Sequence, residues 1–220
     1  MLHLVRPILL SLGLVATAHA ADVETPDHET LVADGAVEVR RYAPVIEAVT
    51  TVEADDARAA ASKAFMTVAS YIFGANEGGA KIDMTAPVRT TAGTRIDMTA
   101  PVRTTAPGSL DDGGSYTIAF VMPAKWTLDT LPKPNDDAVQ LREVPEETLA
   151  ALRFTGERSP AAIAVKEKEL RDWAERNGWT VTGPAALAGY DGPSVASDER
   201  RYEVTLPVKG PGKGQKEKQG

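Results

Sequence analysis

The chain contains no cysteine among its 220 residues. This absence excludes disulfide bonds, iron–sulfur clusters, zinc fingers, cysteine nucleophiles and lipid attachment through cysteine. The stability of the folded protein must therefore come from its core, without covalent cross-links.

Histidine is nearly as rare, since the sequence contains only His3, His19 and His28. None of them is placed to activate a serine, and the chain has no G-x-S-x-G elbow, P-loop or G-x-G-x-x-G motif. Zinc and copper enzymes depend on histidine and cysteine ligands, so the sequence disfavours these classes as well.

Aromatic residues make up only 5% of the chain, so its core must be mostly aliphatic. The other proportions, 43% hydrophobic and 25% charged, are those of an ordinary globular protein. Lysine and arginine number 24 against 31 aspartates and glutamates, which gives a net charge of −7. A chain this acidic does not neutralise phosphates, so we expect no nucleic-acid partner.

The first twenty residues have the pattern of a signal peptide. One positive charge, Arg6, precedes the apolar run from Pro7 to Ala18, and Ala18-His19-Ala20 is an A-x-A cleavage site. The apolar run is too short to span a bilayer as a stable helix. We predict a signal peptide over residues 1–20, cleavage after Ala20, and a periplasmic or secreted protein with no membrane span after cleavage. The alternative is an uncleaved anchor helix.

Alternation of apolar and polar residues predicts strands over residues 37–42, 44–52, 116–122, 139–154, 187–190 and 200–208. The fourth run breaks near Pro145. A first helix ends near Phe73 and buries a stripe formed by Ala61, Phe65, Val68 and Ile72. A second helix opens with Ser159 as its N-cap and Pro160 at its first position. We expect one domain over residues 31–208, between a polar leader (21–30) and a disordered tail (209–220).

The sequence also contains an internal repeat, because residues 82–92 recur letter for letter at residues 96–106. In each copy apolar residues alternate with Asp, Thr and Pro, which predicts a strand with Met84 and Met98 facing inward. The segment between the copies supplies a turn, so we expect them to form a hairpin that is interrupted at its prolines. Asp83 and Asp97 are then expected on the solvent face.

The order strands–helix–strands occurs twice along the chain. The two halves open in a similar way, with Val37-Glu-Val-Arg40 in the first and Val139-Gln-Leu-Arg142 in the second. Two similar halves around one antiparallel sheet predict an α+β domain with internal pseudo-symmetry.

The run Lys81-Ile-Asp-Met-Thr-Ala-Pro-Val88, with its second copy, resembles the signature of the SOUL haem-binding protein family. Further segments match that family in order: 37–42, 65–76, 116–134, 154–156, 190–193 and 200–204. The family usually has a small residue where this chain has Asp83 and Asp97. The resemblance covers roughly residues 30–208 and indicates an exported member of the family.

The resemblance implies a distorted antiparallel β-barrel-like sheet with two helices, built from duplicated strand-helix-strand-strand halves. It also implies non-covalent binding of haem or a free porphyrin in a hydrophobic groove, without catalysis. Such a groove needs an apolar slot and cations for the propionates, and sometimes an axial ligand for the iron.

A shoulder beside the main stripe of the first helix carries residues suited to this slot: Arg58, Ser62, Met66, Ala69 and Phe73. The small residues leave room for a flat ring, Met66 and Phe73 line it, and Arg58 meets a propionate. The resemblance points to the same helix and to the 191–201 loop, where Arg200 and Arg201 are the cations. The alternative is that Met66 and Phe73 pack under a loop while Arg58 is solvated.

An axial ligand is harder to find. Only His28 remains after cleavage, and it lies in the polar leader. The other candidates are Met66, Met84, Met98, Met122, Tyr42, Tyr71, Tyr116, Tyr190 and Tyr202. Methionines at inward strand positions are more typical of core packing than of ligation. We therefore expect no strong axial ligation and no protein metal site.

Three functions are weighed. The first, which we predict, is an exported tetrapyrrole carrier or buffer that is not an enzyme. The second is a module for other amphipathic small molecules, because the SOUL fold resembles the effector-binding domains of some transcription regulators. A shift in absorbance when haemin is added distinguishes the first function from the second. The third is a small hydrolase, which requires a buried groove carboxylate such as Glu203 or Glu47. The arginines beside Glu203 favour a plain ion pair instead. Nothing in the sequence identifies a protein partner.

Overall fold

The computed structural model describes residues 23–92, 110, 113–192 and 194–210. Within these ranges it contains two helices, α1 (Ala57–Ile72) and α2 (Pro160–Arg176). The strands are β1 (His28–Asp34), β2 (Val37–Tyr42), β3 (Val45–Ala54), β4 (Val88–Ala92), β5 (Gly114–Val121), β6 (Gln140–Val144), β7 (Glu147–Thr155), β8 (Thr180–Val181), β9 (Ala186–Gly189) and β10 (Arg201–Lys209). The predicted signal peptide, the second repeat copy with Asp97 and Met98, and the tail lie outside the described residues. No helix in the described ranges is long and apolar enough to cross a membrane.

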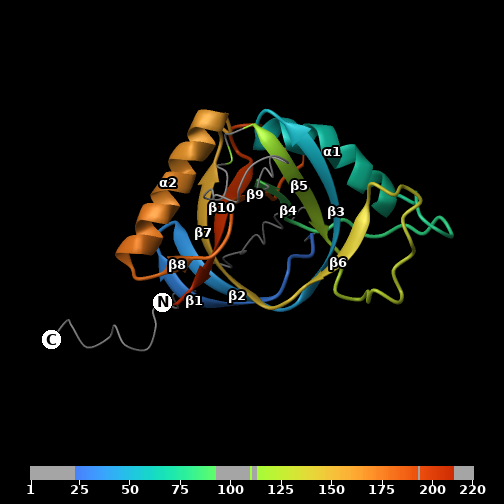
Figure 1. Ribbon diagram of the computed structural model, residues 1–220, viewed down its shortest axis with the longest axis horizontal. Coiled ribbons are helices and arrows are strands. Elements are labelled where there is room, and N and C mark those ends of the chain that lie inside the picture. Colours follow the sequence, from blue (N-terminus) through green and yellow to red (C-terminus); the bar gives the residue numbers. More distant parts are fainter. Residues whose placement is uncertain (1–22, 93–109, 111–112, 193, 211–220) are drawn as a thin grey trace, which may run out of the picture.

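The strands form one antiparallel sheet in the order β1-β2-β7-β10-β9-β4-β5-β3-β6, with β8 paired to β10. The sheet is strongly curved but not closed into a barrel, because β1 and β6 are its two edges (Figure 1). Outward from the central β9–β4 pair, β10, β7 and β2 on one side match β5, β3 and β6 on the other. The prediction of an α+β fold with two pseudo-symmetric halves is therefore confirmed. The opening strand of each half pairs with a strand of the other half, since β2 lies next to β7 and β6 lies next to β3.

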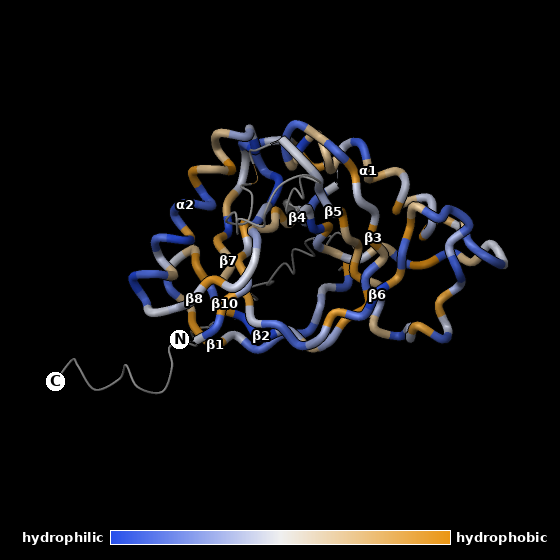
Figure 2. Tube along the Cα trace, viewed as in Figure 1, coloured by the Kyte–Doolittle hydropathy of each residue, from blue (hydrophilic) through white to orange (hydrophobic). Residues whose placement is uncertain are grey.

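Both helices pack against the outer face of the curved sheet (Figure 1). Helix α1 lies on β3, β5 and β4, and α2 lies on β10, β7 and β8. Most outward side chains of these strands are apolar and buried, as with Ile118, Leu152 and Val204. Figure 2 shows that hydrophobic residues follow the strands beneath the helices, while much of the outer helix surface is hydrophilic. The core is mostly aliphatic, as the low aromatic content predicts.

The buried side of α1 differs from the predicted stripe. The helix begins after Asp56, whose carboxylate accepts a hydrogen bond from the Ala59 N–H at 2.8 Å. Val68 and Ile72 are buried as predicted, but Ala61 and Phe65 are only partly buried. The residues buried in their place at the start of the helix are Ala57, Ala60 and Ala64. In a helix this rich in alanine, hydropathy gives little contrast between one face and the next.

Helix α2 and the strand before it agree with the prediction. The Ser159 hydroxyl accepts a hydrogen bond from the Ala162 N–H at 3.3 Å, and Pro160 occupies the first helical turn. The long run before it is divided into β6, which ends at Val144, and β7, which begins at Glu147. Pro145 lies between them and cannot donate a backbone hydrogen bond, which explains the break.

The first repeat copy is a strand only over Val88–Ala92, so the prediction of a strand from residue 82 is wrong. Pro87 has no N–H to give to a ladder. Met84 is 40% exposed and does not face the core, whereas Asp83 is exposed as predicted and pairs with Lys125 at 2.7 Å. Strand β4 pairs with β5 on one side and β9 on the other, which leaves no edge for the predicted hairpin with the second copy.

The fold also begins earlier than the predicted boundary at residue 31. Strand β1 starts at His28 and pairs with β2. Glu24 accepts two backbone hydrogen bonds, one through its carbonyl from the Ala86 N–H and one through its carboxylate from the Ala124 N–H. The polar segment predicted as a leader is therefore attached to the sheet.

Candidate functional site

The predicted groove residues on α1 lie mostly on its outward face. Met66 is 64% exposed and Phe73, which caps the helix, is 59% exposed. Arg58 and Ser62 are exposed as well, while Ala69 is buried. The alternative in which Met66 and Phe73 pack under a loop does not describe this structure. Two large apolar side chains that are two turns apart and open to solvent form a surface suited to a ligand.

Arg200 and Arg201 lie at the start of β10, which β9 separates from the strands beneath α1. The Arg201 guanidinium holds the Asp191 carboxylate at 2.7 Å, and the Arg201 N–H donates to the same carboxylate. These hydrogen bonds hold the pKa of Asp191 below its usual value. The Arg200 Nε donates to the Val195 carbonyl at 2.9 Å. These contacts brace the 191–200 loop at the β10 side of the sheet.

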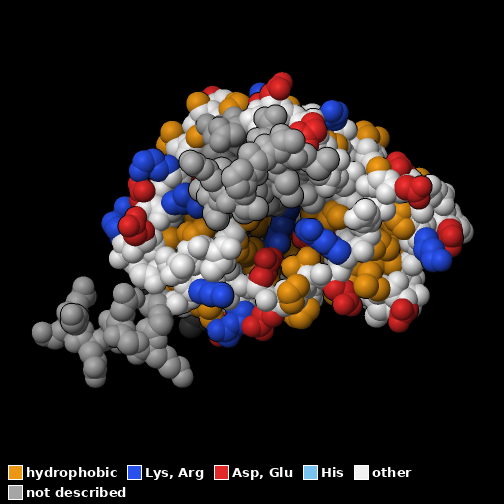
Figure 3. Space-filling model, in the orientation of Figure 1, with side chains coloured by type: hydrophobic (Ala, Val, Ile, Leu, Met, Phe, Trp, Pro, Cys, Tyr) orange, Lys and Arg blue, Asp and Glu red, His pale blue; other side chains and the backbone are white. Residues whose placement is uncertain are grey.

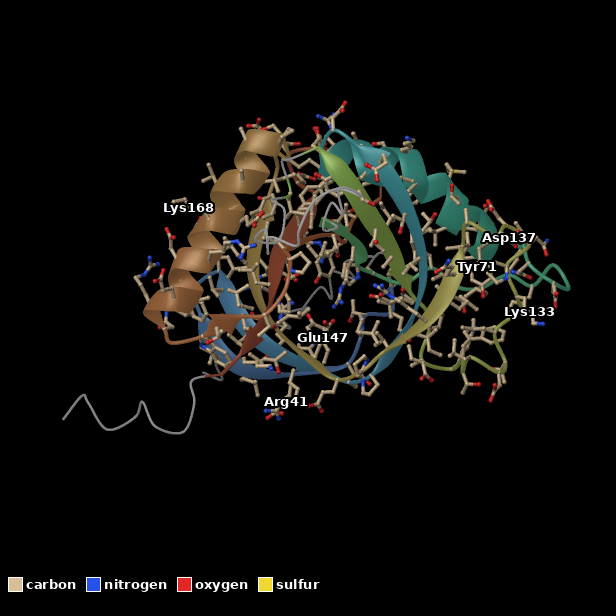
Figure 4. All side chains as sticks on the ribbon, in the orientation of Figure 1. Arg41, Tyr71, Lys133, Asp137, Glu147 and Lys168 are labelled. Carbon is tan, nitrogen blue, oxygen red and sulfur yellow. The ribbon has the colours of Figure 1, made fainter. Side chains whose placement is uncertain are left out.

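The inner face of the sheet carries a cluster of charged side chains that the sequence analysis missed as a group. Strand alternation turns Arg40, Arg89, Glu147 and Glu203 away from the apolar outer face. Figure 3 shows this face hollowed between the two halves, with basic and acidic side chains at its floor. Figure 4 shows Glu147 on the inner side of the sheet and Arg41 on its outside.

The first part of the cluster is an ion pair between Arg40 and Glu203. Two parallel hydrogen bonds of 2.9 and 2.8 Å join them, and their side chains are only 7% and 4% exposed. Arg40 also donates to Glu38 and to the Tyr42 hydroxyl, and the Tyr190 hydroxyl donates to Glu203 at 2.6 Å. Burial lowers the pKa of Arg40, but its bonds to Glu203 more than offset this, so the net pKa is raised and the guanidinium stays charged.

The second part is built on Glu47, whose side chain is 2% exposed. Arg142 binds its carboxylate at 2.7 Å, and Arg89 lies between Glu47 and Glu147, at 3.7 and 2.6 Å. The Arg89 guanidinium also lies 5.5 Å from the centre of the Tyr42 ring, which links the two parts of the cluster.

The two arginines that bind these glutamates come from the repeated opening motif. Arg40 ends Val37-Glu-Val-Arg40 in the first half, and Arg142 ends Val139-Gln-Leu-Arg142 in the second. Glu203 and Glu47 are buried, as a hydrolase would require, but arginines hold both as ion pairs. The partner of Glu203 is Arg40 and not the neighbouring Arg201, whose carboxylate partner is Asp191. This arrangement favours a structural role over acid–base chemistry.

The described residues offer no group of three or more His, Cys, Asp or Glu side chains that could hold a metal ion. His28 lies in β1, where its Nδ1 is 3.2 Å from the Pro26 carbonyl oxygen and its ring is 5.0 Å from that of Tyr42. Met122 and Tyr202 are buried in the core. Among the predicted ligands, Met66 and Met84 are the exposed thioethers of the described chain.

Burial raises the pKa of Tyr71 to about 12, and its hydroxyl donates to the Pro132 carbonyl. Because an unfolded tyrosine titrates near about 10, the native state holds this proton more tightly. The contribution of the protonated Tyr71 hydroxyl to the stability of the folded state is complete below about pH 10, and it is lost as the pH rises towards about 12.

We expect urea unfolding between pH 9 and 12 to show a smaller loss of stability for Tyr71→Phe than for the wild type. Burial raises the pKa of Tyr42 and Tyr190 too, so the loss will be reduced but not abolished. Equal losses would contradict this assignment.

Comparison with known proteins gives a family and a fold. The family description "SOUL heme-binding protein" matches residues 23–207 of the chain. "Heme-binding protein 2" of Homo sapiens is 30% identical over 156 residues, which cover 69% of each protein.

Solved structures with a similar fold share little sequence. The C-terminal domain of EcmrR has a TM-score of 0.57 at 16% identity, covering 79% of this chain and 97% of that domain. An uncharacterized conserved protein from Listeria innocua has a TM-score of 0.55 at 13% identity, covering 79% and 92%. A protein described as a hydrolase from Listeria innocua has a TM-score of 0.52 at 14% identity, covering 81% and 94%. At these identities the likeness concerns the fold alone.

Proposed function

Because the chain belongs to the SOUL heme-binding protein family, we propose that it is an exported tetrapyrrole-binding protein that carries or buffers haem or a porphyrin. Family membership supports tetrapyrrole binding. We further propose the place of binding, the carrier role and export.

The proposed binding surface is the outward face of α1. Its support is the exposure of Met66 and Phe73, 64% and 59%, on a helix whose Tyr71 and Ile72 side chains are buried. A flat tetrapyrrole laid across these two side chains removes apolar surface from water on both partners. Arg58, which lies two turns before Met66, supplies a cation for a propionate.

Haem is held in this proposal without a strong axial ligand. His28 lies in β1, on the other side of the sheet's centre from the strands beneath α1, and its ring is engaged with Tyr42. Affinity then comes from apolar burial and charge, which haem and iron-free porphyrin share. A carrier that releases its cargo is served by such binding, because no coordination bond has to be broken.

Export and the absence of catalysis complete the proposal. Export rests on the Arg6 segment, the apolar run and the Ala18-His19-Ala20 site at the start of the sequence. The assignment as a binding protein rather than an enzyme rests on the family's haem-binding character and on the pairing of Glu47 and Glu203 with arginines. Periplasm or medium is the proposed location.

The test is a titration of the purified protein with haemin and, in parallel, with protoporphyrin, followed by absorbance and tryptophan quenching. We expect saturable one-to-one binding of both, with dissociation constants within a few-fold of each other. Binding of haemin with a six-coordinate spectrum, together with weak porphyrin binding, would show that an axial ligand is present. Failure of both ligands to saturate would reject tetrapyrrole binding.

A further inference from the structure

A pocket of about 760 Å³ lies where β3 begins and where β5 and β6 end, away from the face of α1. Its apolar wall is formed by Val45, Val121, Met122, Trp126 and Val144. The N-terminal segment, residues 24–27, closes one side, where Glu24 accepts hydrogen bonds from the Ala86 and Ala124 N–H groups. A cavity of this size and lining is typical of small-molecule sites.

The charged residues that line this pocket are all acidic, and the nearby Lys125, whose ammonium is 6.0 Å from the centre of the Trp126 ring, is paired with Asp83. Glu24, Asp27 and Glu143 line it, and no lysine, arginine or histidine occurs among its lining residues in the described chain. Asp27 and Glu143 are exposed. Such a rim attracts a cation and repels the propionates of a tetrapyrrole. Figure 3 shows hydrophobic side chains on the right of this face, with acidic and basic side chains among them.

Trp126 adds an aromatic ring to the apolar wall of the pocket. Its indole Nε1 has no accessible surface, so a molecule in the pocket does not reach this N–H. The ring therefore offers apolar contact area to a ligand rather than a hydrogen bond.

From these observations we infer that the pocket is a second ligand site, which takes an amphipathic organic cation. The apolar body of the ligand packs against the valines, Met122 and Trp126, and its positive charge faces the carboxylates of Asp27 and Glu143. The site is separate from the tetrapyrrole surface on α1, and the inference does not depend on tetrapyrrole binding.

The test uses rhodamine 6G, a cationic xanthene dye, and fluorescein, an anionic dye with the same ring system. Fluorescence anisotropy with the purified protein is expected to show saturable one-to-one binding of rhodamine 6G, at least about ten-fold tighter than fluorescein. The double variant Asp27→Asn/Glu143→Gln should weaken rhodamine binding about five-fold or more, since it removes two attractive charges and no contact that holds the fold. Equal affinity for the two dyes would overturn the inference.

The matched control is Asp137→Asn/Glu157→Gln, which removes two exposed acids outside the pocket lining. It should leave rhodamine binding unchanged, and an equal loss in both double variants would mean that only the overall charge of the protein matters.

Competition with haemin distinguishes the second site from the proposed tetrapyrrole surface. If haemin displaces rhodamine one for one, the ligands share a site and the second site is rejected while tetrapyrrole binding stands. If the protein binds rhodamine 6G but neither haemin nor porphyrin, tetrapyrrole binding is rejected while the second site stands.

Discussion

Replacing Glu203 by alanine is expected to lower the free energy of unfolding by about 3 kcal/mol or more. The change removes the carboxylate that receives two hydrogen bonds from Arg40 and one from Tyr190, while both side chains of the ion pair are nearly inaccessible to water. Among the described residues, Arg40 then keeps only Glu38, whose side chain is 20% exposed, as an acidic partner. A buried guanidinium that loses its main counter-ion costs much more than a surface pair is worth. Urea unfolding at pH 7 measures the effect.

Two further variants show whether the loss comes from the orphaned charge. Glu203→Gln keeps the shape of the side chain but removes its charge, so it should also destabilise the protein. The double variant Arg40→Met/Glu203→Leu removes both charges and should recover a large part of the stability, because an apolar pair can replace a buried ion pair. A loss below about 1 kcal/mol for Glu203→Ala would mean that this cluster is well solvated. A double variant that is less stable than Glu203→Ala would mean that the ion pair itself is a net source of stability.

The fold was predictable where local signals are strong. Ser159 and Pro160 mark the start of α2, and Pro145 separates β6 from β7, because capping and the missing proline N–H act within a few residues. Period-two alternation found the apolar outer face of the sheet, and the repeated order of elements gave the two halves. The buried face of α1 was only half predicted, because its alanines pack into the core at positions where hydropathy alone favours no face.

The inner cluster was not predictable as a group. Arg40 and Glu203 are 163 residues apart in the chain and meet only because β2, β7 and β10 are neighbours in the sheet. The sequence did contain one signal, since arginine ends the opening motif of each half. A charged residue at an inward position of both pseudo-symmetric halves indicates a buried partner. The motif indicates duplication, but by itself it does not show which residues its arginines bind.

The shoulder of α1 could be identified from the sequence because helical periodicity needs no tertiary information. It placed Arg58, Met66 and Phe73 on one shoulder, and all three lie exposed. The loop cations could not be placed in this way, because their distance from α1 depends on the strand order. With β9 between β10 and β4, Arg201 pairs with Asp191 in its own loop.

The double variant Met66→Ala/Phe73→Ala is expected to weaken haemin binding by roughly 30- to 150-fold, or about 2–3 kcal/mol. Each side chain loses the apolar area that a flat ring would cover, and their exposure means that neither holds the core together. The thermal unfolding midpoint should therefore stay close to that of the wild type, which separates a binding defect from a folding defect. Val165→Ala is the matched control, since this exposed apolar residue lies on α2 and is 63% exposed. If the α1 variant binds haemin normally while Trp126→Phe does not, the tetrapyrrole lies in the pocket between β3, β5 and β6, and the surface of α1 is not its site.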